Sequence, residues 1–84
     1  MFQPQLDPYL VGRVIARFRS EKGWTQEVLS GLAAIGRSHL SAIENGERKP
    51  TLETLYRISC ALEVPMSDVV RAIEAELNQG QGGE

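Results

Sequence analysis

Apolar residues recur at intervals of three and four positions along most of the chain, and short polar or glycine-containing stretches divide them into five segments. Such intervals place the apolar side chains on one face of an α-helix. The dividing stretches hold residues that begin or end helices, namely Asp or Thr before a segment and Gly or Pro after it. The sequence therefore predicts an all-α fold of five helices, and its 84 residues suffice for one domain with a small core.

The capping residues set the expected helix boundaries. Asp7 and Pro8 form a favourable helix start, and Thr25 and Thr51 can cap two later helices. The predicted helices cover about 8–22, 26–33 and 37–45, a fourth between Thr51 and the break at Val64-Pro65, and a fifth at about 66–77. The expected organisation is a flexible arm, a folded domain and a disordered, Gly- and Gln-rich tail at residues 1–6, 7–77 and 78–84.

Each predicted helix carries an apolar stripe that is expected to form the core. The positions are Val11, Val14, Ile15 and Phe18; Val28, Leu29 and Leu32; Leu40 and Ile43; Leu52, Leu55, Ile58 and Leu62; and Met66, Val69, Val70, Ile73 and Leu77. Trp24 is expected to cover the core as a lid. Five apolar positions on the last helix exceed what a small core needs, so part of that stripe predicts a contact with another subunit. The candidate dimer-interface residues are Val69, Val70, Ile73 and Leu77.

The stretch from Thr25 to Gly46 predicts two short helices joined by a tight turn, which is a helix-turn-helix. In the second helix Leu40, Ile43 and Glu44 fall on one side. Short side chains fall on the other, namely Ser38, Ser41, Ala42 and Asn45. A helix with a small polar outer face and an arginine at its start suits insertion into the major groove of DNA.

Five segments of the chain match the phage-repressor and Cro class of DNA-binding domains, also called the XRE family, in both residue type and spacing. The matching residues are Arg19, Trp24-Thr25-Gln26-Glu27, Leu29, Arg37-Ser38, Leu40-Ser41, Ile43-Glu44-Asn45-Gly46, Pro50-Thr51-Leu52-Glu53 and Ala61-Leu62. The chain resembles this family from about Val11 to Val70, and restriction-modification controller proteins are similar members. The resemblance implies a five-helix, lambda-repressor-like domain that binds double-stranded DNA with its second and third helices.

The resemblance also implies structural and phosphate-contacting residues. Arg19 would form a largely buried ion pair with Glu44, the alternative being two solvated surface charges. Gln26 would contact the DNA backbone at a helix start, where free amides attract anions; alternatively it is a plain exposed side chain. The loop after the 37–45 helix, which corresponds to the recognition helix of the family, would lie along the phosphates and contribute Asn45, Arg48 and Lys49. Alternatively, these side chains are simply solvated.

The expected base contacts come from the outer face of the 37–45 helix. Arg37 can bind guanine bidentately, contact a phosphate, or remain solvated. Ser38, Ser41 and Ala42 are short enough to approach base edges, the alternative being a merely exposed Ser-rich face. His39 lies at the flank and is equally compatible with phosphate contact and with solvent exposure.

The turn departs from the family pattern at two positions. Ala34 stands where many relatives have Gly, so a left-handed conformation there would be strained. Gly36 replaces the usual Ser or Thr cap. The fold is unaffected, but the angle of the recognition helix depends on how the turn accommodates these residues.

The net charge of −2 is unevenly distributed along the chain. Residues 1–57 contain eight Lys/Arg and six Asp/Glu, whereas residues 58–84 contain one Lys/Arg and five Asp/Glu. That asymmetry fits a modestly basic face toward phosphate. A single Cys60, expected to be a buried thiol, and a single His39 predict no disulfide, metal site, cofactor or catalytic triad, hence no enzyme. The absence of an apolar spanning run and of a signal segment predicts a cytoplasmic, nucleoid-associated protein.

Two functions remain open on these grounds. The first is a sequence-specific transcriptional regulator, a repressor or controller that binds an inverted repeat as a homodimer and blocks or contacts RNA polymerase. The second is a protein-interaction module or antitoxin-like adaptor, in which the last helix binds a different protein and DNA binding is secondary. The short tail after that helix argues against an antitoxin.

Overall fold

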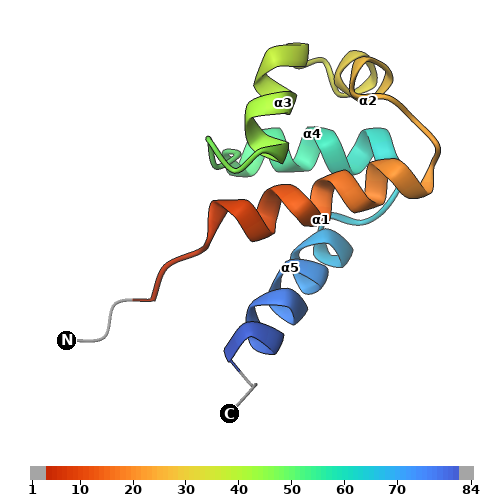
Figure 1. Ribbon diagram of the computed structural model, residues 1–84. Helices are drawn as coiled ribbons and strands as arrows, with labels where there is room; N and C mark the ends of the chain where they lie inside the picture. The colour runs from red at the N-terminus through yellow and green to blue at the C-terminus, as the bar shows by residue number, and fades with distance from the viewer. Residues whose placement is uncertain (1–3, 82–84) are drawn as a thin grey trace.

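A computed structural model describes residues 4–81, and all of the regular structure in that range is helical. The helices are α1 (Pro8–Glu21), α2 (Gln26–Ala33), α3 (Arg37–Glu44), α4 (Leu52–Leu62) and α5 (Met66–Gln81). The all-α, five-helix prediction is confirmed. In Figure 1, α1 crosses the middle of the molecule, with α2 and α3 on one side of it and α5 on the other.

The predicted N-caps are present. Asp7 Oδ1 accepts a hydrogen bond of 2.9 Å from the backbone N–H of Tyr9, and Pro8 occupies the first turn of α1. Thr25 accepts from the N–H of Val28 at 3.2 Å, and Thr51 begins α4 in the same way. These bonds satisfy amides that the helices leave without an internal partner. Gly36 starts α3 without a side-chain cap.

Two helices end in the same unusual way. Ala34 after α2 and Glu63 after α4 adopt the left-handed conformation, with φ of 59° and 62°. In each case the next residue returns an N–H to the helix, Ile35 to Ser30 O at 3.0 Å and Val64 to Ser59 O at 3.1 Å. This closes a Schellman motif whose apolar second residue packs on the core. The strain expected at Ala34 is therefore present, and Glu63 repeats it.

The core is formed where α1 packs against α3 and α5, and where α4 packs against α2 and α5. Its buried members are aliphatic and come from all five helices, namely Val11, Val14, Ile15, Leu29, Ala33, Leu40, Ile43, Leu55, Ile58, Leu62, Val69 and Ile73. Trp24 and Phe18 pack against this cluster from its edge. The lid position expected for Trp24 is confirmed.

Three apolar positions expected in the core are instead exposed. Val28 and Leu32 are 43% and 57% exposed, because α2 faces α4 with Leu29, Ser30 and Ala33. The buried face of α2 is thus shifted by one residue along the sequence from the expected face. Its two small side chains, Ser30 and Ala33, let α2 and α4 approach closely. Leu52 is 71% exposed because it is the first residue of α4 and lies at the mouth of a surface groove.

The expectation of a buried Cys60 is wrong. The packed face of α4 consists of Leu55, Ile58, Ser59 and Leu62, and Cys60 falls outside it, so that its thiol is exposed. Ser59 takes the buried position. Its hydroxyl donates to the carbonyl of Leu55 at 2.8 Å, which satisfies the polar group within the helix.

The last helix also differs from its prediction. It continues to Gln81, four residues past Leu77, so the disordered tail does not begin at residue 78, and residues 82–84 lie outside the described range. Val69 and Ile73 are buried in the core of the chain itself. Val69 is completely enclosed and cannot also face another subunit, whereas Val70, Ile73 and Leu77 line a surface groove, so the candidate interface of α5 is reduced to these three residues.

Candidate nucleic-acid interface

The recognition helix α3 has the two faces that its sequence predicts. Leu40, Ile43 and Glu44 are buried against the rest of the protein. Arg37, Ser38 and Asn45 are exposed, and Ser41, Ala42 and His39 are half-buried around them. Because α1 separates α3 from α5, the exposed face of α3 lies on one side of the molecule with nothing from the described chain over it (Figure 1).

A buried ion pair fixes α3 to α1, as the sequence implied. Arg19 Nε lies 2.7 Å from Glu44 Oε2, and Arg19 Nη2 donates to Glu44 Oε1 at 2.9 Å. Arg19 Nη1 also donates to the carbonyl of Trp24 at 2.8 Å. The hydrogen bonds to Glu44 raise the pKa of Arg19 above its usual value, while burial opposes that shift. With side chains 17% and 4% exposed, the pair forms a bidentate contact shielded from water.

The ion pair has a third member that the sequence did not predict. Gln26 Nε2 donates to Glu44 Oε1 at 2.9 Å, so one carboxylate joins α1, α2 and α3. This contact fixes the side chain of Gln26 at the start of α2. Its amide has a second hydrogen, and the first-turn N–H groups of a helix have no internal acceptor. The only sequence signal for the contact was the presence of two polar residues on helices expected to pack together.

The loop after α3 is held by hydrogen bonds back to that helix and by a close approach to α1. The N–H groups of Glu47 and Arg48 both point to the carbonyl of Ala42, at 2.9 and 3.3 Å. Gly46 has a φ of 81°, and a side chain there would place its Cβ 2.9 Å from the Cα of Tyr9 in α1. An ordered loop of this kind presents its side chains in a fixed position relative to α3.

Three cations surround the exposed face of the helix-turn-helix. Arg37 at the start of α3 and Arg48 and Lys49 in the loop are all exposed. The ion pairs found within residues 4–81 engage Arg17, Arg19, Arg57 and Arg71 instead. Arg37, Arg48 and Lys49 thus carry positive charge that no described carboxylate neutralises, as an anion-binding surface requires.

Within the described residues, no group of three or more His, Cys, Asp or Glu side chains could hold a metal ion. None of the helices described has the length and apolar character that crossing a membrane requires.

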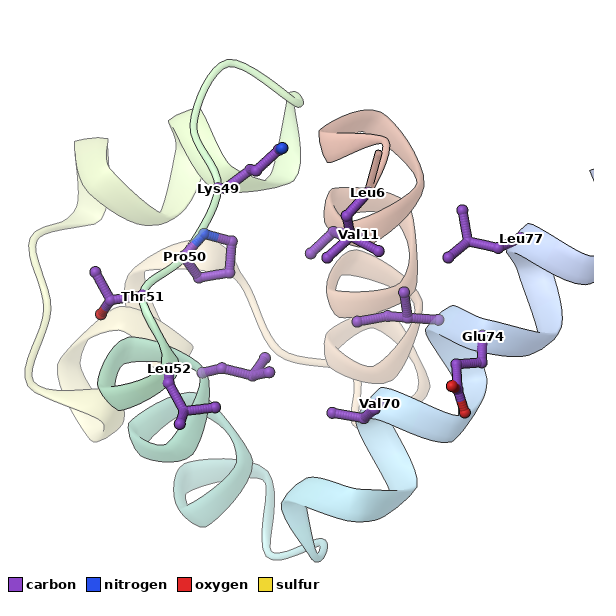
Figure 2. A pocket seen from close by; sticks show the side chains of 11 residues that line it. Leu6, Val11, Lys49, Pro50, Thr51, Leu52, Val70, Glu74 and Leu77 are labelled. Atoms are coloured by element: carbon purple, nitrogen blue, oxygen red, sulfur yellow. The ribbon is translucent and has the colours of Figure 1, made fainter. Parts of the chain in front are cut away.

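A second feature lies on another part of the surface. An apolar groove of about 430 Å³ opens between the start of α1, the start of α4 and the side of α5 that faces them (Figure 2). Its lining is mostly aliphatic and consists of Leu6, Val11, Lys49, Pro50, Thr51, Leu52, Leu55, Val70, Ile73, Glu74 and Leu77. The two charged members, Lys49 and Glu74, come from the loop after α3 and from α5 respectively.

A capped helix, a tight turn and a second helix with a small polar outer face define a helix-turn-helix protein. The chain belongs to the helix-turn-helix family of the XRE type, whose sequence pattern matches residues 15–69. It is 43% identical over 61 residues to the HTH-type transcriptional regulator y4dJ of Sinorhizobium fredii, covering 73% of this chain and 79% of that protein. It is 30% identical over 76 residues to the transcriptional regulator SlrR of Bacillus subtilis, covering 89% of this chain.

The chain spans 50% of the length of SlrR and 32% of that of the regulator SutR of Escherichia coli. Solved structures of similar size match over nearly their whole length. The restriction-modification controller protein C.Esp1396I superposes with a TM-score of 0.81 at 30% identity, over 90% of this chain and 99% of that one. The clp gene regulator ClgR of C. glutamicum superposes with a TM-score of 0.78 at 26% identity, over 88% and 95%.

These similarities confirm the lambda-repressor-like fold and the resemblance to controller proteins. They place the chain among DNA-binding regulators of transcription and not among enzymes.

Proposed function

We propose that this protein regulates transcription by binding, as a homodimer, to an inverted repeat in double-stranded DNA. The observation that carries the proposal is the exposed face of α3, where Arg37 and short side chains stand clear of the protein while Glu44 fixes the helix from behind. A rigid helix with a small outer face can enter the major groove without displacing any protein contact.

The proposed contacts divide by position on the helix-turn-helix. Arg37, Ser38, Ser41 and Ala42 are assigned to base edges, since they lie on the exposed or half-buried side of α3. Gln26, His39, Asn45, Arg48 and Lys49 flank that side and are assigned to phosphates. Phosphate contacts position the protein, whereas base contacts give sequence preference.

We assign the apolar groove to a second copy of the chain. Of the candidate α5 residues, Val70, Ile73 and Leu77 line it, together with Leu6 and Leu52 from other elements. Around a two-fold axis, the mostly aliphatic linings of two grooves can face each other, as a contact between identical surfaces requires. Pairing would bring two α3 helices to a separation of about 34 Å, one turn of DNA.

The test is selection from a randomised duplex pool, followed by fluorescence anisotropy on the selected site and on a scrambled duplex at two salt concentrations. An inverted repeat should emerge, with affinity that falls steeply as salt rises. Arg37→Ala should reduce the preference for the selected site by about 5- to 150-fold, equivalent to about 1–3 kcal/mol. Arg71→Ala removes another exposed cation, from α5, and should leave that preference unchanged. A pool without enriched sequence would contradict the proposal.

A second function is favoured by a different observation. Leu52 and Tyr56 lie one turn apart on α4 and are both largely exposed, and Leu52 also lines the groove. Such a surface also suits a different protein, either RNA polymerase at a promoter or the partner of an adaptor module. Co-purification of one defined partner, together with a monomeric chain in sedimentation at micromolar concentration, would favour this function over the homodimer.

A further inference from the structure

We propose that Gly12 is a positioning residue for DNA recognition, because its missing side chain sets the distance between α1 and the end of α3. The inference rests on the proposed DNA-binding function. Gly12 is buried in the middle of α1, where glycine destabilises a helix relative to alanine. Its presence there calls for a physical reason, and the packing against α3 supplies one.

The backbone of α3 occupies the space that a side chain at Gly12 would need. A Cβ at this position would lie 2.6 Å from the carbonyl oxygen of Glu44 and 2.8 Å from its carbonyl carbon, and it would be closer still to the carbonyl oxygen of Ile43. These are backbone atoms, so no rotamer change can relieve the contact. The helices would have to separate by about 1 Å to restore ordinary van der Waals distances.

The displaced atoms belong to the part of α3 that anchors the helix. Glu44 is the residue that Arg19 and Gln26 hold, and Ala42, which directly precedes Ile43, accepts the amides of the following loop. A shift at Ile43 and Glu44 therefore acts on the ion pair and the loop together. Gly12 and the ion pair jointly define where the C-terminal end of α3 lies.

The other end of α3 carries the groups proposed to contact bases and has weaker restraints. Gly36 gives it no side-chain cap, and Arg37 is exposed. An eight-residue helix is about 12 Å long, so moving one end by about 1 Å tilts it by about 5°. Bidentate contact with a base edge tolerates such misalignment poorly, while contact with phosphates by long side chains tolerates it well.

A second glycine provides a matched control. Gly31 lies inside α2, and a Cβ there would meet nothing within 4 Å. Gly31→Ala makes the same chemical change within the same helix-turn-helix unit, without a steric conflict. It should retain the site preference of the wild-type chain.

The experiment compares wild type, Gly12→Ala and Gly31→Ala. For each, the folded fraction is measured by circular dichroism, and the dissociation constants for the selected duplex and for a scrambled duplex are measured at one salt concentration. We expect folded Gly12→Ala to lose at least tenfold in the ratio of the two constants, with affinity for the scrambled duplex changed by less than threefold. Gly31→Ala should match wild type in both.

Each other outcome overturns the inference. If folded Gly12→Ala keeps the wild-type ratio, the residue serves packing only. If the variant is unfolded, the measurement is repeated in trimethylamine oxide, which favours the compact state; a chain that then discriminates normally, or stays unfolded, equally contradicts a positioning role. Failure of the wild-type chain to prefer any duplex would instead contradict the proposed function, so the two failures are distinct.

Discussion

At the scale of single residues, Glu44 is the side chain on which the DNA-binding unit depends most. Its carboxylate is almost completely buried and accepts hydrogen bonds from Arg19 on α1 and Gln26 on α2. The sequence indicated the pair with Arg19 through the family resemblance. It could not indicate Gln26, because that contact depends on the angle at which α2 crosses the end of α3.

Removing the cation from this network should strongly destabilise the protein. Arg19→Met leaves the buried carboxylate with only a neutral donor, and we expect a loss of about 3–5 kcal/mol in the free energy of unfolding. Arg17→Met is the control, since its ion pair with Glu76 lies at the surface and should contribute less than about 1 kcal/mol. Urea denaturation of both variants measures the difference. Equal losses would mean that the Glu44 pair is no stronger than a surface contact.

The left-handed residue between α2 and α3 gives a stabilising substitution. Ala34 adopts a conformation that disfavours a Cβ by about 1–2 kcal/mol, and glycine removes this strain while making the unfolded chain more flexible. Ala34→Gly should therefore raise the free energy of unfolding by about 0.5–1 kcal/mol. The midpoint of urea denaturation should increase, and a decrease would show that Ala34 makes packing contacts that outweigh its backbone strain.

At the scale of helices, the sequence predicted which segments are helical but not always which face they bury. Capping residues are local signals, and the starts of α1, α2 and α4 follow them. The buried face of α2 depends on its neighbour. Ser30 and Ala33 are small enough to let α4 approach, so they are buried while larger apolar side chains beside them are exposed. The end of α5 was misplaced because its polar residues continue the helix at the surface.

A matched pair of substitutions tests the assigned face of α2. Leu29→Ala removes a fully buried side chain and should cost about 2–5 kcal/mol of stability. Leu32→Ala makes the same change at a side chain that is mostly in solvent, and we expect a loss of about 1 kcal/mol or less. Similar losses at the two positions, measured by thermal or urea denaturation, would contradict the face seen in the structure.

At the scale of the whole molecule, the charges that are unevenly distributed along the sequence lie on two different surfaces. Arg37, Arg48 and Lys49, which have no described carboxylate partner, lie on α3 and in the loop after it, while α5 carries Asp68, Glu74 and Glu76 on the other side of α1. Composition alone gave the imbalance along the chain. Its distribution over two surfaces depends on α1 lying between α3 and α5, which no local sequence signal predicts.

The proposed interface on that other side can be tested with two substitutions that add the same charge. Val70→Glu places a carboxylate at the apolar groove, on a side chain exposed enough to leave the core intact. It should convert the protein to a folded monomer in sedimentation velocity and weaken binding to an inverted repeat at least tenfold. Ala75→Glu adds the charge to an exposed position of α5 outside the groove and should change neither. A dimeric Val70→Glu would exclude the groove as the interface.

The separation of the groove from α3 has a consequence for dosage in the cell. Because pairing through the groove would leave both recognition helices uncovered, assembly and operator binding become successive equilibria. When most of the protein is monomeric, the amount of dimer rises with the square of the protomer concentration. A twofold change in gene copy number then changes operator occupancy by up to about fourfold, which makes regulation by this protein responsive to its rate of synthesis.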